Sequence, residues 1–272
     1  MRLGSRQAYR SALANWDALV NDIGQGERAF ARELFAVADM IAHSPALAGA
    51  LDDTARSPED RARLASQVLG AHVSGEISDL VQGLAREAWS EEGDLGRAIE
   101  ALGVQTLLAG AQREKSLDRL ETELYSLRAL LISNRDLYNA LRDSIYPLDR
   151  RQNLAARILC DATVYAQELL KRAIEKSATV SIEDSLSEYI DIVAERCEHV
   201  VASVQAAVPL SAEQENRLAD ILARIYGKDV RIHTDINPAL IGGVKVAIGN
   251  DVIDGTIATK LDNVKKVFNN RR

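Results

Sequence analysis

The chain has 272 residues, of which 47% are hydrophobic and 27% are charged, and its formal net charge is −7. This composition can build a sizeable core in one or two domains and excludes wholesale disorder. An acidic chain has no general attraction to phosphate backbones, so nucleic acid is a disfavoured partner. No apolar run reaches the roughly 18 residues of a transmembrane helix, and residues 1–7 open no secretory signal. Cys160 and Cys197 lack metal-ligand spacing, which favours reduced thiols.

Residues 1–199 are predicted to be helical almost throughout. Aromatic residues make up only 4% of the chain, and alanine and leucine, which favour closely packed helices, supply most of the apolar content. Ser57 and Pro58 predict a helix start, with serine as the cap and proline at the first helical position. Residues 94–128 form either one long helix or two helices broken near Gly103 or Gly110.

An internal repeat becomes visible when the sequence is displaced by 90 positions. Residues 33–70 then align with residues 123–160 without a gap, and ten of the 38 pairs are identical. Seven of these ten are Leu or Ala, which a helical protein would partly match by chance. A duplicated helical unit is nevertheless favoured over coincidence, and its period is too long for a short-repeat solenoid.

The periodicity changes from helical to alternating after about residue 200. Residues 202–208 predict a strand, and residues 230–234 and 244–248 predict two more. Between the first two strands, Ser211 and Gln214 have the spacing of a capping box, and Gly227 is expected to end that helix.

The end of the chain is predicted to turn and become helical again. Asp251 and Asp254 are interpreted as a turn and a helix start, in preference to a pair of carboxylates for acid–base chemistry. Residues 257–268 are predicted to form a last short helix.

Together these patterns predict a mainly α fold: an N-terminal helical bundle with an inserted second helical copy, followed by a small C-terminal α/β domain. We expect the first bundle copy over residues 1–92. The inserted region and its long closing helix cover residues 93–199, and the α/β domain covers residues 200–272.

The sequence carries no convincing catalytic motif. Residues 240–243, Leu-Ile-Gly-Gly, lack the Gly-Lys-Ser/Thr of a phosphate-binding loop and are better explained by positive φ or a close backbone approach. The four histidines are scattered without zinc-site spacing. No GxSxG elbow marks a nucleophile, although a triad assembled in space stays open. We therefore predict no catalytic residue, no cofactor and no metal.

Two short apolar faces recur at helical spacing. One contains Tyr9, Leu13 and Trp16, and the other contains Leu80, Val81 and Leu84. Either set suits the core of a bundle, which is the simpler interpretation. Paired, the two sets would instead line an apolar groove for a partner helix.

The C-terminal third resembles a known family. The resemblance rests on residues 204–211, 214, 226–228, 238–243, 249–256 and 261. Their order and spacing are similar to the bacterial F-type ATP synthase delta subunit and its mitochondrial counterpart, the oligomycin-sensitivity-conferral protein. The Leu-Ile-Gly-Gly and Val-Ile-Asp-Gly segments are specific together. Thr256 stands where the family usually has Ser, and residues 5–13 are similar to the family's first helix.

The resemblance covers residues 5–88 and about 185–272. The extra helical unit between them is similar to the enlarged form of the actinobacterial branch, where delta is often fused behind a b-type stalk segment. No such segment precedes Met1, so we expect either a free-standing subunit or the delta part of a fusion.

The resemblance implies a non-catalytic stator subunit, present in one copy per complex. Such a subunit links the catalytic head to the b-type peripheral stalk at the cytoplasmic face of the plasma membrane. It thereby resists rotor torque during proton-driven ATP synthesis. The alternative is a stand-alone helical adaptor outside any ATP synthase.

The resemblance also implies two contact regions. The groove for the N-terminal helix of an alpha subunit would lie between the first and fifth helices and include Tyr9, Leu13, Trp16, Leu80, Val81 and Leu84. The contact with the b-type stalk would include Leu240, Ile241, Gly242 and Gly243, four residues that serve equally well to maintain the fold.

The second copy differs at the groove positions. Ile99, Gly103 and Thr106 stand where copy one has its two aromatics and a leucine, so we expect the alpha contact in copy one. The hypothesis for the inserted copy is a second contact, because residues 124, 127 and 131 retain a stripe of leucines.

Overall fold

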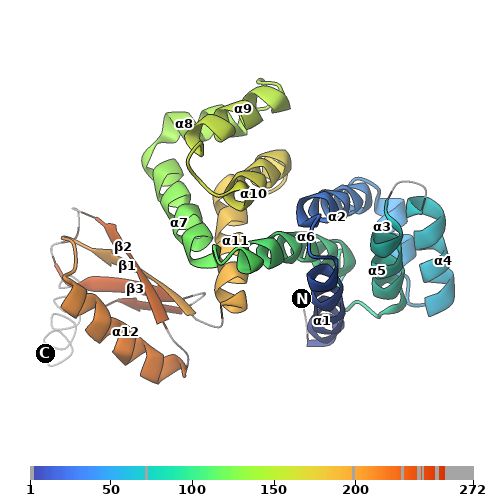
Figure 1. The fold of residues 1–272 in the computed structure, drawn as a ribbon, viewed down its shortest axis with the longest axis horizontal. Coiled ribbons are helices and arrows are strands. Elements are labelled where there is room, and N and C mark those ends of the chain that lie inside the picture. The colour runs from blue at the N-terminus through green and yellow to red at the C-terminus, as the bar shows by residue number, and fades with distance from the viewer. Residues whose placement is uncertain are drawn as a thin grey trace, which may run out of the picture. The chain divides into compact units, whose positions relative to one another are not determined.

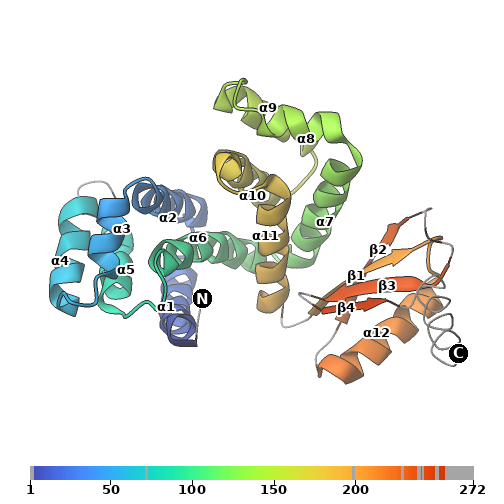
Figure 2. The ribbon, with the colours of Figure 1, turned by 180° about the vertical axis from the view of Figure 1, so that it is seen from behind.

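The structure is a computed structural model. It describes residues 3–70, 73–197, 200–227, 230–237, 240, 242–248 and 251–254. The chain divides into two compact units, Met1–Leu117 and Asp118–Arg272, and Figures 1 and 2 show the helices and strands of each.

The described residues of the first unit form a helical bundle. Its helices are α1 (Leu3–Ile23), α2 (Glu27–Ala42), α3 (Pro45–Asp52), α4 (Pro58–Leu69), α5 (Gly75–Arg86) and α6 (Asp94–Arg113). The predicted helix start is confirmed, because Pro58 opens α4 and the Asp60 backbone N–H donates to Ser57 Oγ at 3.1 Å. Leu34, Ile77 and Ile99 are completely buried in its core.

Helix α6 closes this unit, which therefore extends beyond the predicted domain end at residue 92. It packs along α2 and also contacts α1 and α5. Gly103 permits this packing, because a Cβ there would lie 2.5 Å from Cε1 of Phe35. Gly103 and Gly110 are both buried inside α6 and break no helix. The break follows Arg113 instead, where Lys115 has a φ of 54°.

The helices of the second unit repeat those of the first. They are α7 (Leu117–Ser133), α8 (Arg135–Arg142), α9 (Leu148–Ile158), α10 (Val164–Glu175), the 3-10 helix η1 (Lys176–Ala178) and α11 (Ile182–Arg196). Displaced by 90 residues, the bounds of α3 become those of α8, and α4 begins where α9 begins. By the same displacement, α6 corresponds to α1.

A shared contact supports the duplication. Glu33 Oε2 accepts a hydrogen bond from the Ser74 backbone N–H at 2.7 Å, just before α5. Its repeat counterpart Glu123 accepts one from the Thr163 backbone N–H at 2.9 Å, just before α10. The two copies therefore hold their last helix in the same way, which chance identity of leucines and alanines would not produce.

The leucine stripe of the second copy is not a free contact surface. Leu124, Leu127 and Leu131 are 0%, 3% and 1% exposed. The observation behind the hypothesis of a second contact is therefore corrected, because these side chains form the core of their own unit.

The C-terminal part is a mixed sheet covered by one helix. It contains β1 (Val200–Ala206), α12 (Ala212–Tyr226), β2 (Val230–Ile236), β3 (Val244–Ile248) and β4 (Asp251–Asp254). The strand order is β2-β1-β3-β4, with β1 parallel to β2 and the other pairs antiparallel. Leu222 of α12 packs on Val204 and Val246, and the predicted capping box of α12 is present. The sheet shares one unit with α7–α11, whereas the sequence suggested separate domains.

Strand β4 corrects the prediction for Asp251 and Asp254. Both residues lie in a strand that pairs with β3, where Asp254 stands opposite Lys245. Pairing with β3 gives the backbone N–H and C=O groups of this segment hydrogen-bond partners without a helix. The predicted helix over residues 257–268 lies outside the described residues.

Candidate helix-docking site

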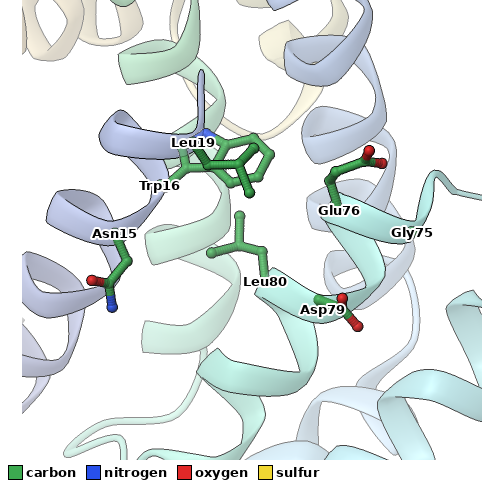
Figure 3. Close-up of a pocket in the computed structure, with 7 residues that line it drawn as sticks. All are labelled: Asn15, Trp16, Leu19, Gly75, Glu76, Asp79 and Leu80. Carbon is green, nitrogen blue, oxygen red and sulfur yellow. The ribbon is translucent and has the colours of Figure 1, made fainter. Parts of the chain in front are cut away.

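An open pocket of about 550 Å³ lies between α1 and α5 of the first unit (Figure 3). Trp16 and Leu19 of α1 and Leu80 of α5 point toward one another and form its apolar part. Its other lining residues are Asn15, Gly75, Glu76 and Asp79. The lining residues are 15, 16 and 19 on α1 and 75, 76, 79 and 80 on α5. This recurrence after one helical turn places them on one side of each helix.

The apolar floor of the pocket is held rigidly by Trp16. This side chain is 3% exposed, and its Nε1 donates a hydrogen bond to Thr106 Oγ1 at 2.8 Å. Thr106 Oγ1 in turn donates to the Leu102 carbonyl at 2.6 Å. The Trp16 and Phe30 rings also form a T-shaped pair, with ring centroids 5.7 Å apart. A side chain fixed by packing and hydrogen bonds costs little further entropy when a ligand binds.

The rim of the pocket is acidic on the α5 side. Glu76 and Asp79 are exposed in the first turns of α5. Gly75 opens the helix without a side chain, and a Cβ there would meet no atom within 4 Å. The pocket therefore offers apolar contact at its floor and negative charge at its edge.

The structure divides the predicted groove residues into lining and core. Trp16 and Leu80 line the pocket, whereas Tyr9 and Leu13 are partly buried and pack against the hydrophobic core. Val81 and Leu84 are 0% and 1% exposed.

For Val81 and Leu84 the predicted place in the groove is corrected. On α5 they lie one and four residues after Leu80, where the helix turns toward the core. Leu19, Glu76 and Asp79 were missed, although a signal existed, because Leu19 lies three residues after Trp16 and Glu76 four before Leu80.

The corresponding positions of copy two cannot form a second such pocket. Ile99 and Thr106 are completely buried, and Gly103 lies against the Phe35 ring. All three serve the core of the first unit. This explains why the aromatics of α1 are absent from α6.

The residues predicted to meet the stalk form the connection between β2 and β3. Leu240 donates its backbone N–H to the Asn237 carbonyl at 3.1 Å. Gly242 and Gly243 have φ values of 154° and 83°, a region that favours glycine. Ile241 lies outside the described residues. The described residues of this set thus have a clear role in the fold.

A second pocket, of about 470 Å³, lies in the second unit and is polar. Arg231 on β2 donates to Glu121 Oε2 at 2.5 Å and to Asp118 Oδ1 at 2.7 Å on α7. His233 stacks on Tyr125 with ring centroids 3.7 Å apart. Burial, with Glu121 and Asp118 nearby, raises the pKa of the Cys197 thiol in this pocket. A raised pKa disfavours the thiolate, so the site does not activate Cys197 as a nucleophile.

The described part of the chain contains no group of three or more His, Cys, Asp or Glu side chains that could hold a metal ion. Within it, no single helix is long and apolar enough to cross a bilayer. The pair α2 and α3 passes that test together by length and composition, but is bent by 98°.

Comparison with known proteins identifies the family. Residues 104–268 match the family described as ATP synthase delta (OSCP) subunit. The ATP synthase subunit delta of Beutenbergia cavernae is 35% identical over 98% of both chains, and that of Streptomyces griseus is 33% identical over 98% of both. That of Kineococcus radiotolerans is 36% identical over 86% of this chain and 85% of the relative.

A solved structure of the mitochondrial ATP synthase hexamer of Toxoplasma gondii contains a chain with a TM-score of 0.39 and 17% identity. The alignment covers 61% of this chain and 94% of that chain.

The family match and the three subunit delta relatives define a structural subunit of a larger assembly and not an enzyme in its own right. The chain belongs to the ATP synthase delta (OSCP) subunit family. It is a peripheral-stalk subunit of the F-type ATP synthase, and it is peripheral to the membrane as part of that complex. The sequence-based resemblance is thereby confirmed, and a stand-alone adaptor is not supported.

Proposed function

We propose that this subunit joins the catalytic head to the stalk by holding the N-terminal helix of an alpha subunit in the pocket between α1 and α5. Its C-terminal α/β part, residues 200–272, would meet the b-type stalk at the cytoplasmic face of the membrane. The observation that carries the first contact is the pocket itself, which is open, apolar at its floor and built on a buried, hydrogen-bonded tryptophan.

The chemistry of the pocket specifies the helix that fits it. Trp16, Leu19 and Leu80 require apolar side chains at a spacing of three to four residues. Glu76 and Asp79 along the rim favour lysine or arginine beside that apolar stripe. The partner helix is therefore amphipathic with basic flanks.

Magnitudes show that this contact is modest when it acts alone. Burying the remaining exposed surface of two leucine-sized side chains contributes at most roughly 3–6 kcal/mol. Association costs on the order of 4–15 kcal/mol, and nanomolar affinity requires about −12 kcal/mol overall. A stator under torque therefore needs the charged rim and at least one further attachment, since linked sites raise the effective concentration.

The test is binding of a tryptophan-free peptide with the sequence of the alpha N-terminal helix to the full chain. The emission of Trp16, which lines the pocket, reports binding. We expect Leu80→Asp to weaken binding at least tenfold, because it places a charge on the apolar floor. The matched control is Ile132→Asp on α7, where the side chain is 60% exposed and outside the pocket.

A second variant guards against misfolding, because Leu80 also packs on the core. The double variant Glu76→Lys and Asp79→Lys changes only exposed side chains. We expect it to weaken binding and to remove most of the dependence on salt concentration. Binding that is unchanged in both variants, with the circular dichroism of the parent, would refute the proposed occupant.

A further inference from the structure

The corner between α8 and α9 exposes three large apolar side chains. Ile145 is 82% exposed, Tyr146 49% and Leu148 39%. Figure 1 shows this corner at the end of α7 remote from the sheet of the same unit. Three large apolar side chains within four residues, all exposed, are unusual on the surface of a soluble protein and mark an interaction site.

The internal repeat provides a control for this corner. In copy one, the corner between α3 and α4 has the same backbone: the Ala55 N–H donates to Asp53 Oδ1 at 2.9 Å. In copy two, the Ile145 N–H donates to Asp143 Oδ1 at 3.0 Å. The aspartate thus fixes the turn in both copies through a backbone N–H. The side chain of the residue that donates this N–H, Ala55 or Ile145, can therefore be small or large.

The two corners differ in the side chains that they display. Ala55, Arg56 and Pro58 of copy one stand where copy two has Ile145, Tyr146 and Leu148, and all six are exposed. Because the backbone is the same in both copies, the turn itself does not require large apolar side chains at these positions, and Ile145 is left almost fully in solvent. Their chemistry therefore points to contact with another molecule.

The charges around the corner define that molecule further. Arg142 and Arg150 are exposed on either side of it and form no ion pair with any other residue that the structure describes. Residues 135–157 contain five arginines and three aspartates, whereas the matching residues 45–67 contain three arginines and four acidic residues. In a chain with a net charge of −7, this is a locally basic surface, and it complements carboxylates.

We propose that the α8–α9 corner docks into an apolar hollow rimmed by carboxylates on another protein subunit of the ATP synthase. The inference rests on membership of that complex and goes beyond the α1–α5 pocket. Ile145 is 82% exposed on a turn that Asp143 fixes, so the partner supplies the concave side and little ordering cost falls on this chain. Tyrosine and arginine are also the residue types that most often dominate the energetics of such contacts.

The corner supplies the further attachment that the pocket between α1 and α5 requires. Two contacts on separate units of one chain convert the second binding event into an intramolecular one. The buried leucine stripe of α7 cannot do this, whereas the α8–α9 corner can. The duplicated region thus gains a function that its own core does not provide.

The experiment measures binding of the full, fluorescently labelled chain to ATP synthase from which this subunit has been stripped. The corner variant combines Ile145→Ala, Tyr146→Ser and Leu148→Ala, which alter only exposed side chains. We expect at least tenfold weaker binding. The matched control is Ile132→Ala on α7, an exposed isoleucine outside the corner, which is expected to bind like the parent.

Two further measurements identify the partner. The double variant Arg142→Glu and Arg150→Glu is expected to weaken binding more at low salt than at high salt. A photoreactive benzoylphenylalanine in place of Tyr146 is expected to link the chain, within the intact complex, to a peptide of another subunit that carries several carboxylates.

Three results would overturn the proposal: a corner variant that binds within twofold of the parent, a cross-link only to lipid, or a cross-link only to a basic peptide. Loss of binding to vesicles containing anionic phosphatidylglycerol, with unchanged binding to the stripped complex, would assign the corner to a membrane instead. The peptide assay with Leu80→Asp tests the α1–α5 pocket separately, so failure of one contact is distinguishable from failure of the other.

Discussion

The close packing of α6 on α2 gives a quantitative prediction at Gly103. In Gly103→Ala, the new Cβ would lie 2.5 Å from Cε1 and 2.7 Å from Cδ1 of Phe35. Carbon atoms normally approach to about 3.5–4.0 Å, so the ring has to move by about 1 Å. Phe35 is 7% exposed and has little room to do so. Such overpacking costs typically about 1–3 kcal/mol.

A gain in helix propensity opposes this cost. Alanine stabilises a helix interior by about 1 kcal/mol relative to glycine. The control Gly83→Ala on α5 isolates that gain, because its Cβ would meet no atom within 4 Å. We expect Gly83→Ala to raise the free energy of unfolding by up to about 1 kcal/mol. We expect the free energy of unfolding of Gly103→Ala to be about 1–3 kcal/mol lower than that of the control. Over most of this range Gly103→Ala is also less stable than the parent.

The chain offers a probe that reports on the first unit alone. Both of its tryptophans, Trp16 and Trp89, lie in this unit and are 3% and 6% exposed. Urea unfolding followed by tryptophan fluorescence therefore gives the free energy of unfolding of that unit. A change of 1 kcal/mol shifts the midpoint by roughly 0.3–1 M urea. Equal stabilisation by Gly103→Ala and Gly83→Ala would refute the packing of α6 on Phe35, and so would an undiminished difference between them in a Phe35→Leu background.

Three further predictions concern charged and titratable groups. Arg231→Met removes a charged hydrogen-bond partner of the buried Glu121 and should destabilise the second unit by about 1.5–3 kcal/mol. Thermal melting followed at 222 nm measures the loss, and adding Glu121→Gln should restore part of it. Burial alone would raise the pKa of Asp94, but hydrogen bonds from Arg97 and Ser5 hold it below its ordinary value. This stabilisation is present above about pH 4 and is lost as the pH falls through the lowered pKa, so Ser5→Ala should flatten the acid loss in tryptophan-detected urea melts. The raised pKa of Cys197 predicts slow alkylation at pH 7 that accelerates as the pH rises.

Local chemistry made much of the secondary structure predictable. Ser57 with Pro58 and Ser211 with Gln214 are signals that act within one turn of helix, and both helices begin there. The alternation of large apolar residues with other residues over 244–248 is likewise a local signal, because it predicts a strand with one face covered. Strand β4 escaped prediction because it is four residues long and two of them are aspartates.

The tertiary roles of single residues were harder to predict. The spacing of Leu80, Val81 and Leu84 identifies a helix face about one turn wide, but it does not tell which edge of that face borders solvent. Gly103 illustrates the same limit, because a glycine inside a helix signals either a break or a close approach, and only the position of Phe35 decides between them.

The double role of α6 limits how the extra unit could be removed from the chain. A deletion beginning at residue 93 would remove α6, which packs on α2, α1 and α5 of the first bundle. It would also remove Thr106, the acceptor of the Trp16 hydrogen bond. A deletion that starts after Arg113 keeps α6 in the first bundle. The second copy therefore cannot be removed as an independent unit, because its first helix is a structural part of the first bundle.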